Sequence, residues 1–256
     1  MKITVYGIVQ GVGFRPTVFR VAKAMGLKGY VLNNGSNVEI HLDKDAEEFL
    51  ERLRKALPSL ARIDRADIEE TREELGDFTI AQSTDGKRVS LIPTDTAICR
   101  QCADDFASAG DKRHLFPFTN CTECGARFTV IADVPFDRAR TSMSDFPVCP
   151  SCHDEYASPE DRRFHAQTLS CPECGPRYTL YNKEGSALPG EPFPEFAKGM
   201  EGGAVGLLKG WGGMHIVCTF ANAPRLRKVY RRGDKPYAVM MRDLGAAERY
   251  AIIGDQ

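Results

Sequence analysis

The stretch that decides the organisation of the chain is its middle, where four C-x-x-C pairs stand as CRQC at 99–102, CTEC at 121–124, CPSC at 149–152 and CPEC at 171–174. An offset of 50 residues (149 − 99) places the first two pairs on the last two, so this region is an internal repeat. In each repeat 18 residues separate the pairs (121 − 102 − 1 and 171 − 152 − 1), a spacing typical of zinc sites. Two thiolates from each of two tight turns complete a tetrahedron around one ion and leave no open position. The repeat therefore predicts two structural zinc ions, with Cys99, Cys102, Cys121, Cys124, Cys149, Cys152, Cys171 and Cys174 as ligands.

The spacing leaves open which pairs share an ion. In the simpler arrangement, consecutive pairs bind one ion. A crossed arrangement would join the first pair with the fourth and the second pair with the third, and it would also satisfy both ions.

Composition and the start of the chain narrow the class of protein. The chain has 256 residues, a formal net charge of −1 and 42% hydrophobic residues, which is typical of a soluble globular protein and argues against a general polyanion binder. The first residues, MKITVY, lack the apolar core and cleavage site of a signal peptide. No run of 18 apolar residues predicts a membrane span. We therefore expect a cytoplasmic protein without a membrane partner, in a reducing compartment where paired cysteines bind metal.

Residues 1–84 alternate strand and helix patterns. β-branched residues at 3–9 predict a strand, and a helix is expected from Pro16 to a stop at Gly26. A hairpin is predicted around Asn34-Gly35-Ser36, an amphipathic helix at 46–57, and further strands at 63–71 and 77–81. The order β-α-β-β-α-β predicts a ferredoxin-like fold of the α+β class.

The last part of the chain returns to an α/β pattern. Proline-rich 188–194 is predicted to be a linker, 196–201 a short helix, and 204–208 and 214–217 strands. We therefore expect three domains, at 1–84, 85–185 and 190–256, the last of them an incomplete α/β segment.

The segment VQGVGFRP at 9–16 joins the first predicted strand to the first predicted helix. Glycines let backbone N–H groups converge on an anion at a helix N-terminus, and Arg15 adds a planar fork of donors that suits phosphate oxygens. Asn33 ends the strand predicted to lie beside the first, where an amide can hold a water for attack on phosphorus. A tight turn with a surface arginine is the alternative. The predicted phosphate-binding loop comprises Gln10, Gly11, Val12, Gly13 and Phe14.

Several motifs resemble those of known families. VQGVGFR at 9–15, with GYVLN at 29–33, resembles the acylphosphatase signature. The zinc region of the HypF family, the hydrogenase maturation carbamoyltransferases, is similar to FTNCTECGARFTVI at 118–131, VPFDRARTSM at 134–143 and EYASPEDRRFHAQ at 155–167. The start of the YrdC-like domain of that family is similar to KGWGGMHIVC at 209–218 and RRGDKPYAVM at 231–240.

The resemblance implies a sequence of reactions. An acylphosphatase-like domain hydrolyses carbamoyl phosphate, and a YrdC-like domain joins the released carbamate to AMP, using ATP with magnesium. A last domain transfers the carbamoyl group to the partner protein HypE, for the cyanide ligands of the NiFe-hydrogenase iron. Carried onto this sequence, Arg15 binds phosphate, Asn33 positions the water, and the nucleotide site includes Lys209, Arg232 and Lys235.

The end of the chain departs from the family pattern. Tyr230 stands where the family has a lysine, and Gly233 where it has a proline. Most of the YrdC-like domain and the whole transfer domain are expected to be missing. We therefore expect a fragment or split form that does not complete the transfer alone, with ATP and magnesium used only in a complete YrdC-like domain.

A binding module is the alternative function, in which the zinc repeats hold a protein or nucleic acid beside an inactive first domain. The presence of both Arg15 and Asn33 favours the enzyme, and nucleic acid is not an expected partner. The basic residues that could serve a binding module are Arg127, Arg138, Arg140, Arg162, Arg163 and Arg177. We expect them instead to pair with the interleaved acidic residues Asp133, Asp137, Asp145, Asp154, Glu155 and Asp161.

Overall fold

The computed structural model describes residues 1–85 and 91–254 of the chain. The chain forms two compact units, Met1–Tyr178 and Thr179–Gln256. The cysteine repeat therefore packs together with the first fold, while the last segment forms a unit of its own. The division into three domains at 1–84, 85–185 and 190–256 stays a prediction. Among the described residues, no helix has the length and apolar character needed to cross a bilayer.

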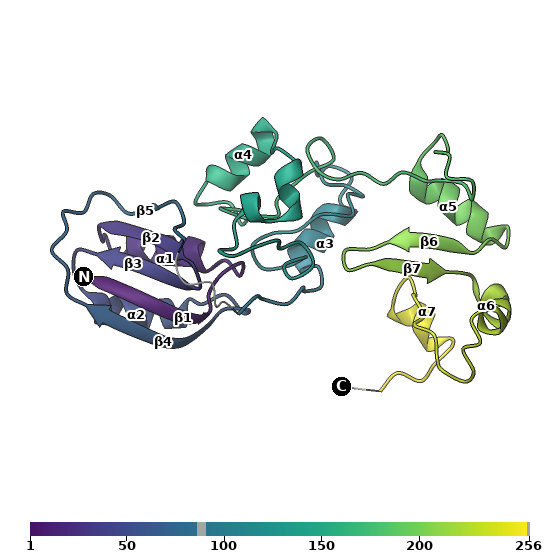
Figure 1. The fold of residues 1–256 in the computed structure, drawn as a ribbon, viewed down its shortest axis with the longest axis horizontal. Coiled ribbons are helices and arrows are strands. Elements are labelled where there is room, and N and C mark those ends of the chain that lie inside the picture. Colours follow the sequence, from purple (N-terminus) through teal and green to yellow (C-terminus); the bar gives the residue numbers. More distant parts are fainter. Residues whose placement is uncertain (86–90, 255–256) are drawn as a thin grey trace. The chain divides into compact units, whose positions relative to one another are not determined.

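The first unit begins with the predicted ferredoxin-like fold (Figure 1). Five strands form one sheet in the order β4-β1-β3-β2-β5, with β5 parallel to β2 and the other neighbouring strands antiparallel. The α+β class predicted from the sequence is confirmed. The strand that carries Asn33, β2, pairs with β3 and β5, so the prediction that it lies beside the first strand is wrong. The elements are β1 (Lys2–Ile8), α1 (Phe14–Ala24), β2 (Gly29–Asn34), β3 (Asn37–Leu42), α2 (Ala46–Lys55), β4 (Arg62–Glu69) and β5 (Thr79–Ile80).

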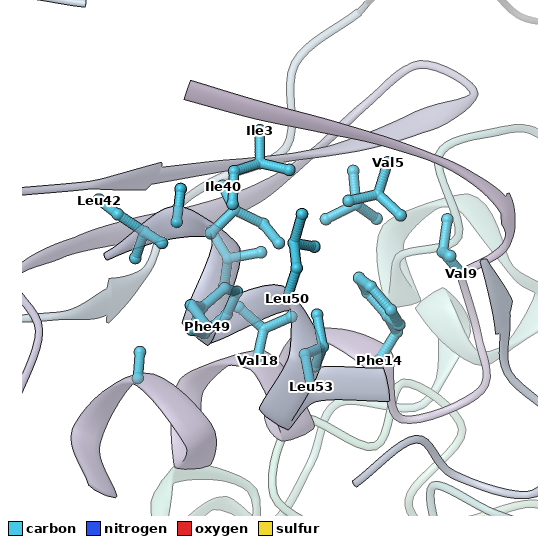
Figure 2. Packing of buried hydrophobic residues seen from close by; sticks show 14 of the residues in the cluster. Ile3, Val5, Val9, Phe14, Val18, Ile40, Leu42, Phe49, Leu50 and Leu53 are labelled. Atoms are coloured by element: carbon cyan, nitrogen blue, oxygen red, sulfur yellow. The ribbon is translucent and has the colours of Figure 1, made fainter. Parts of the chain in front are cut away.

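One hydrophobic core fills the space between the sheet and its two helices (Figure 2). Helical spacing places Phe14 and Val18 on the inner side of α1, and Phe49 and Leu53 on the inner side of α2. Strand alternation directs every second side chain of β2 inward. The same alternation buries Asn33 near the end of β2, so a polar side chain lies on the core side of the sheet.

The first helix begins at Phe14, two residues before the predicted start at Pro16. Gly13 precedes it in a left-handed conformation with φ of 76°, which a glycine adopts without strain. Pro16 then lies in the first helical turn, where its missing N–H costs no hydrogen bond. Arg15 therefore lies in the first turn of α1, directly after the glycine loop.

The cysteine repeat contains little regular structure. A short helix follows the first cysteine of each repeat, because these cysteines lie in extended backbone and the next residues turn into the helix. The elements are α3 (Arg100–Ala107), the 3-10 helices η1 (Arg138–Arg140) and η2 (Ser142–Asp145), and α4 (Pro150–Ala157).

The second unit contains a two-stranded antiparallel sheet and short helices. Helix α5 begins at Pro192, inside the predicted linker at 188–194, because proline suits the first turn of a helix. The linker is therefore shorter than predicted. The elements are α5 (Pro192–Glu201), β6 (Gly206–Lys209), β7 (Met214–Val217), η3 (Phe220–Asn222), α6 (Ala223–Val229) and α7 (Leu244–Glu248).

Candidate functional site

Arg15 is buried, with 9% of its surface exposed, which contradicts the alternative of a surface arginine. Its Nη1 atom donates to Ser83 Oγ at 3.2 Å. Its Nη2 atom donates to Phe136 O at 3.3 Å and to Asp137 Oδ1 at 2.7 Å. The guanidinium thus joins the ferredoxin-like fold to the segment between the two cysteine repeats.

Asn33 is fully buried, and neither its Nδ2 nor its Oδ1 atom has a hydrogen-bond partner among the described residues. Its backbone oxygen accepts from Thr84 N at 2.8 Å. Thr84 follows Ser83, which accepts from Arg15, so one short segment contacts both residues. Buried polar atoms are nearly always satisfied in folded proteins. The unpaired amide is therefore a candidate site for a polar ligand or a water.

The glycine loop is covered by the cysteine repeat. Gly11 and Gly13 have φ of 69° and 76°, and a Cβ added to Gly11 would lie 3.1 Å from the Phe136 ring. Gly11 O accepts a hydrogen bond from Arg127 Nε. Both glycines are therefore needed for the backbone conformation, and Gly11 also for close packing.

Gln10 has a structural role that the sequence did not indicate. Its Nε2 atom donates to Gly35 O at 2.9 Å and to Asn37 O at 3.2 Å, across the β2–β3 hairpin. Its Oε1 atom accepts from Phe136 N at 3.0 Å. Of the other predicted loop residues, Val12 and Phe14 lie in the hydrophobic core. These side chains are hydrogen-bonded to the hairpin or packed in the core, so the backbone is the part of the loop best suited to bind phosphate.

A cavity lies between the loop and the cysteine repeat. His165 lines it beside Arg15. Burial, and then the charge of Arg15, lowers the pKa of His165 to about 4, so this ring is neutral near pH 7. Neither His165 nor Asp137 is predicted as a site residue from the sequence, although both lie in motifs that resemble the HypF zinc region. The cavity lining includes Gly11, Gly13, Arg15, Thr122, His165 and Gln167.

The eight paired cysteines form two clusters of four, one from each repeat. Neighbouring Sγ atoms lie 3.8 Å apart in the first cluster and 3.7 Å apart in the second. Four sulfurs at ~2.3 Å from one ion, at the corners of a tetrahedron, lie ~3.8 Å apart. The clusters therefore fit zinc, and the structure brings consecutive pairs together rather than crossed ones. They are Cys99, Cys102, Cys121 and Cys124, and Cys149, Cys152, Cys171 and Cys174.

Arginines of each repeat donate hydrogen bonds to the other repeat, and this reciprocal arrangement is called the arginine exchange. Arg113 of the first repeat donates to Ser170 O, to the Glu155 carboxylate and to Cys152 Sγ in the second. Fifty residues later, Arg163 donates to Asn120 O and to the Asp105 carboxylate in the first repeat. Neighbouring Arg162 donates to Cys102 Sγ. Each cluster thus receives an N–H···S bond from the other repeat, as in an isologous interface within one chain.

These contacts correct the ion pairs expected from the sequence. Arg162 and Arg163 pair with Asp105, and Arg140 with Asp85, so the partners are not the interleaved acidic residues. Arg127 is 2% exposed and donates to backbone oxygens of Gly11, Cys121, Thr122, Cys124 and Ala126. Arg138 likewise donates to the oxygens of Phe146, Gln167 and Leu169. Most of the basic residues considered for a binding surface therefore hold the repeat together.

The arginine exchange predicts that one repeat controls metal retention in the other. Arg113→Ala should weaken metal binding at the second cluster about 10- to 100-fold, because such outer-shell donors typically contribute that much. Cysteine labelling read by mass spectrometry during mild chelation measures each cluster separately. Arg113→Lys should give partial retention. Arg177→Ala removes an exposed donor to Pro172 O within the same repeat and should resemble wild type. Equal labelling of both clusters in Arg113→Ala would contradict the exchange.

The predicted nucleotide residues lie in the second unit. Lys209 ends β6, and its Nζ atom donates to Gly210 O at 3.0 Å. Arg232 donates to Pro236 O at 2.9 Å, and the backbone oxygen of Lys235 accepts from Arg227 at 3.0 Å. Each of them contacts residues nearby in the sequence, and their assignment to a nucleotide site stays a prediction.

Two family models match parts of the chain. The acylphosphatase family model matches residues 1–80, and the HypF finger model matches residues 98–131 and 148–181. A carbamoyltransferase HypF from Rhizobium leguminosarum bv. viciae is 48% identical over 256 residues, which cover 98% of this chain and 32% of the relative. An acylphosphatase from Thermotoga maritima is 46% identical over 85 residues, 31% of this chain and 93% of that enzyme.

One solved structure matches nearly the whole chain, including the glycine loop and both cysteine clusters. The crystal structure of full-length HypF in the phosphate- and nucleotide-bound form is 38% identical, with a TM-score of 0.88, and the match covers 99% of this chain and 34% of that one. The chain therefore spans about a third of the length of these relatives.

Proposed function

Because the chain belongs to the HypF family and contains an acylphosphatase domain and two HypF fingers, we propose that residues 1–80 hydrolyse an acyl phosphate. The proposed substrate is carbamoyl phosphate. The observation that carries this proposal is the pairing of a buried arginine beside a glycine loop with the fully buried, unpaired amide of Asn33. That combination suits a phosphoryl group and a water better than it suits a structural core.

The reaction needs a placed water and stabilised phosphoryl oxygens, and no covalent nucleophile. Backbone N–H groups of the loop and the Arg15 guanidinium would bind the phosphoryl oxygens. Asn33 would orient the water, whose oxygen attacks phosphorus while the bond from phosphorus to the acyl oxygen breaks. The carbamate leaves with that electron pair, and the proton of the water passes to solvent or to the leaving group. Charge stabilisation by preorganised donors is the main contribution of the protein.

The two cysteine clusters would hold two structural zinc ions. Their tetrahedral spacing fits the ion, all four positions are filled by thiolates, and zinc would therefore supply folding energy rather than chemistry. The finger region, residues 99–178, also covers the glycine loop through Phe136 and Arg127. We therefore assign to it the role of a rigid wall for the hydrolytic site.

In the full reaction, the released carbamate would enter carbamoyl adenylation and transfer to a HypE-type partner, for the cyanide ligands of a NiFe-hydrogenase. This role in hydrogenase maturation rests on the family. Lys209, Arg232 and Lys235 would contribute to the nucleotide site, with ATP and magnesium, in a complete YrdC-like domain. The alternative of a nucleic-acid-binding module is weakened by the internal contacts of Arg127, Arg138 and Arg163.

Asn33→Ala tests the role of the unpaired amide. We expect turnover of carbamoyl phosphate to fall about 100-fold, because a misplaced water loses the near-attack geometry, with little change in the Michaelis constant. Asn34→Ala is the matched control, because the side-chain amide of Asn34 is hydrogen-bonded to Glu39 and Thr84 and does not lie on the core side of the sheet. Steady-state kinetics separates the two parameters. A raised Michaelis constant with unchanged turnover would show that Asn33 binds substrate and does not position water.

A further inference from the structure

The finger region places a carboxylate on the arginine that is proposed to bind phosphate. Asp137 lies 122 residues beyond Arg15 in the chain, and its Oδ1 atom accepts from Arg15 Nη2 at 2.7 Å. The side chains of Arg15 and Asp137 are 10% and 25% exposed. The ion pair is therefore partly shielded from water, where charge interactions are stronger than at the surface.

This contact uses donors that a phosphoryl group would need. The two hydrogens of Arg15 Nη2 go to Asp137 Oδ1 and to Phe136 O, while Nη1 donates to Ser83 Oγ. A bidentate grip on phosphate requires two parallel N–H groups from one edge of the guanidinium. Both edges that include Nη2 are occupied, so a bidentate ligand has to displace one of these acceptors.

Of the two acceptors on Nη2, the carboxylate is the one that can leave. Phe136 is fixed on both sides, because its N–H donates to Gln10 Oε1, its ring packs against Gly11, and the residue is 2% exposed. Asp137 needs only a side-chain rotation to release Arg15. A phosphoryl dianion beside the Asp137 carboxylate would also be repelled by it.

We propose that Asp137 is a substrate-affinity determinant of the hydrolytic site. Its carboxylate neutralises the buried Arg15 until a phosphoryl dianion replaces it. This inference rests on the proposed function of Arg15 as a phosphate ligand. An isolated buried cation is unfavourable, so the carboxylate stabilises the ligand-free site and thereby weakens phosphate binding. A dianion interacts about twice as strongly as a monoanion at the same distance, which lets phosphate displace the internal carboxylate.

The test is binding of inorganic phosphate to the full chain, measured by calorimetry or phosphorus NMR. Asp137→Asn keeps the shape of the side chain and removes its charge, and phosphate should bind on the order of fivefold to tenfold more tightly. Asp137→Ala should show the same direction. Asp145→Asn makes the same charge change at an exposed position, and Ser83→Ala removes a neutral contact of Arg15, so neither should tighten binding.

Unchanged or weaker phosphate binding in Asp137→Asn would overturn the proposal and would indicate that Asp137 only orients Arg15. Because the readout is binding of phosphate and not turnover, it separates this inference from the proposed hydrolysis. Tighter phosphate binding without any hydrolysis by wild type would support the role of Asp137 and contradict the proposed enzyme function.

Discussion

Arg15→Ala is expected to lower kcat/KM for carbamoyl phosphate by more than 100-fold, a loss of at least ~3 kcal/mol of transition-state stabilisation. The reason is geometric as well as electrostatic. The guanidinium is buried beside the loop and is held by Ser83 and by the backbone of Phe136, so it is preorganised before substrate binds. Arg15→Lys keeps the charge but loses the planar fork, and it should stay severely impaired. Steady-state hydrolysis of carbamoyl phosphate and of a simple acyl phosphate measures both variants.

Arg54→Ala is a matched control for that experiment, because Arg54 lies exposed on α2 and should leave hydrolysis unchanged. Circular dichroism of the variants checks that the fold is retained. If Arg15→Ala kept the wild-type kcat/KM, Arg15 would have no role in hydrolysis.

Metal removal should unfold the finger region while the ferredoxin-like core persists. The packed clusters of the fingers consist mostly of cysteines, with Ala166 and Leu169 in the second, whereas the first fold has a separate hydrophobic core. Structural zinc sites typically contribute an apparent ~10–16 kcal/mol, comparable to the ~5–15 kcal/mol stability of a whole domain. Without the ion, residues 99–178 therefore lack a sufficient core.

Hydrogen exchange after chelation measures this difference. Amides of α3 and α4 should lose protection, and amides of β1, β3 and α1 should keep it. Metal analysis of the untreated chain should find two zinc ions. Clearly fewer than two ions with all thiols intact, or fingers that stay protected after chelation, would show that the clusters are not zinc sites.

The fold was predictable from the sequence where the signals are local. Alternation at 28–33 and 38–42 and the helical spacing of Phe49 and Leu53 gave the order of strands and helices. The C-x-x-C spacing likewise predicted two four-cysteine clusters. Which pairs come together could not be predicted, because consecutive and crossed arrangements satisfy two ions equally. The structure resolves the pairing, because each cluster comes from one repeat.

The contacts around Arg15 could not be predicted from the sequence either, because they join distant parts of the chain. Asp137 and His165 lie more than a hundred residues from the glycine loop in sequence, and no periodicity connects them to it. Interleaved charges suggested local ion pairs, whereas Arg163 reaches Asp105 across the repeat and Arg127 donates to backbone oxygens. Long-range packing therefore overrides local charge pattern in this region. The motifs that hold Asp137 and His165 were recognised, but only as part of the zinc region.

Hydrolysis of carbamoyl phosphate by the zinc-loaded chain, followed as release of inorganic phosphate, tests the proposed function of Arg15 and Asn33. We predict steady turnover that depends on Arg15 and Asn33 and is unchanged by Asn34→Ala. A folded, zinc-loaded chain that releases phosphate no faster than the buffer would contradict the central claim and would favour a binding role for the finger region.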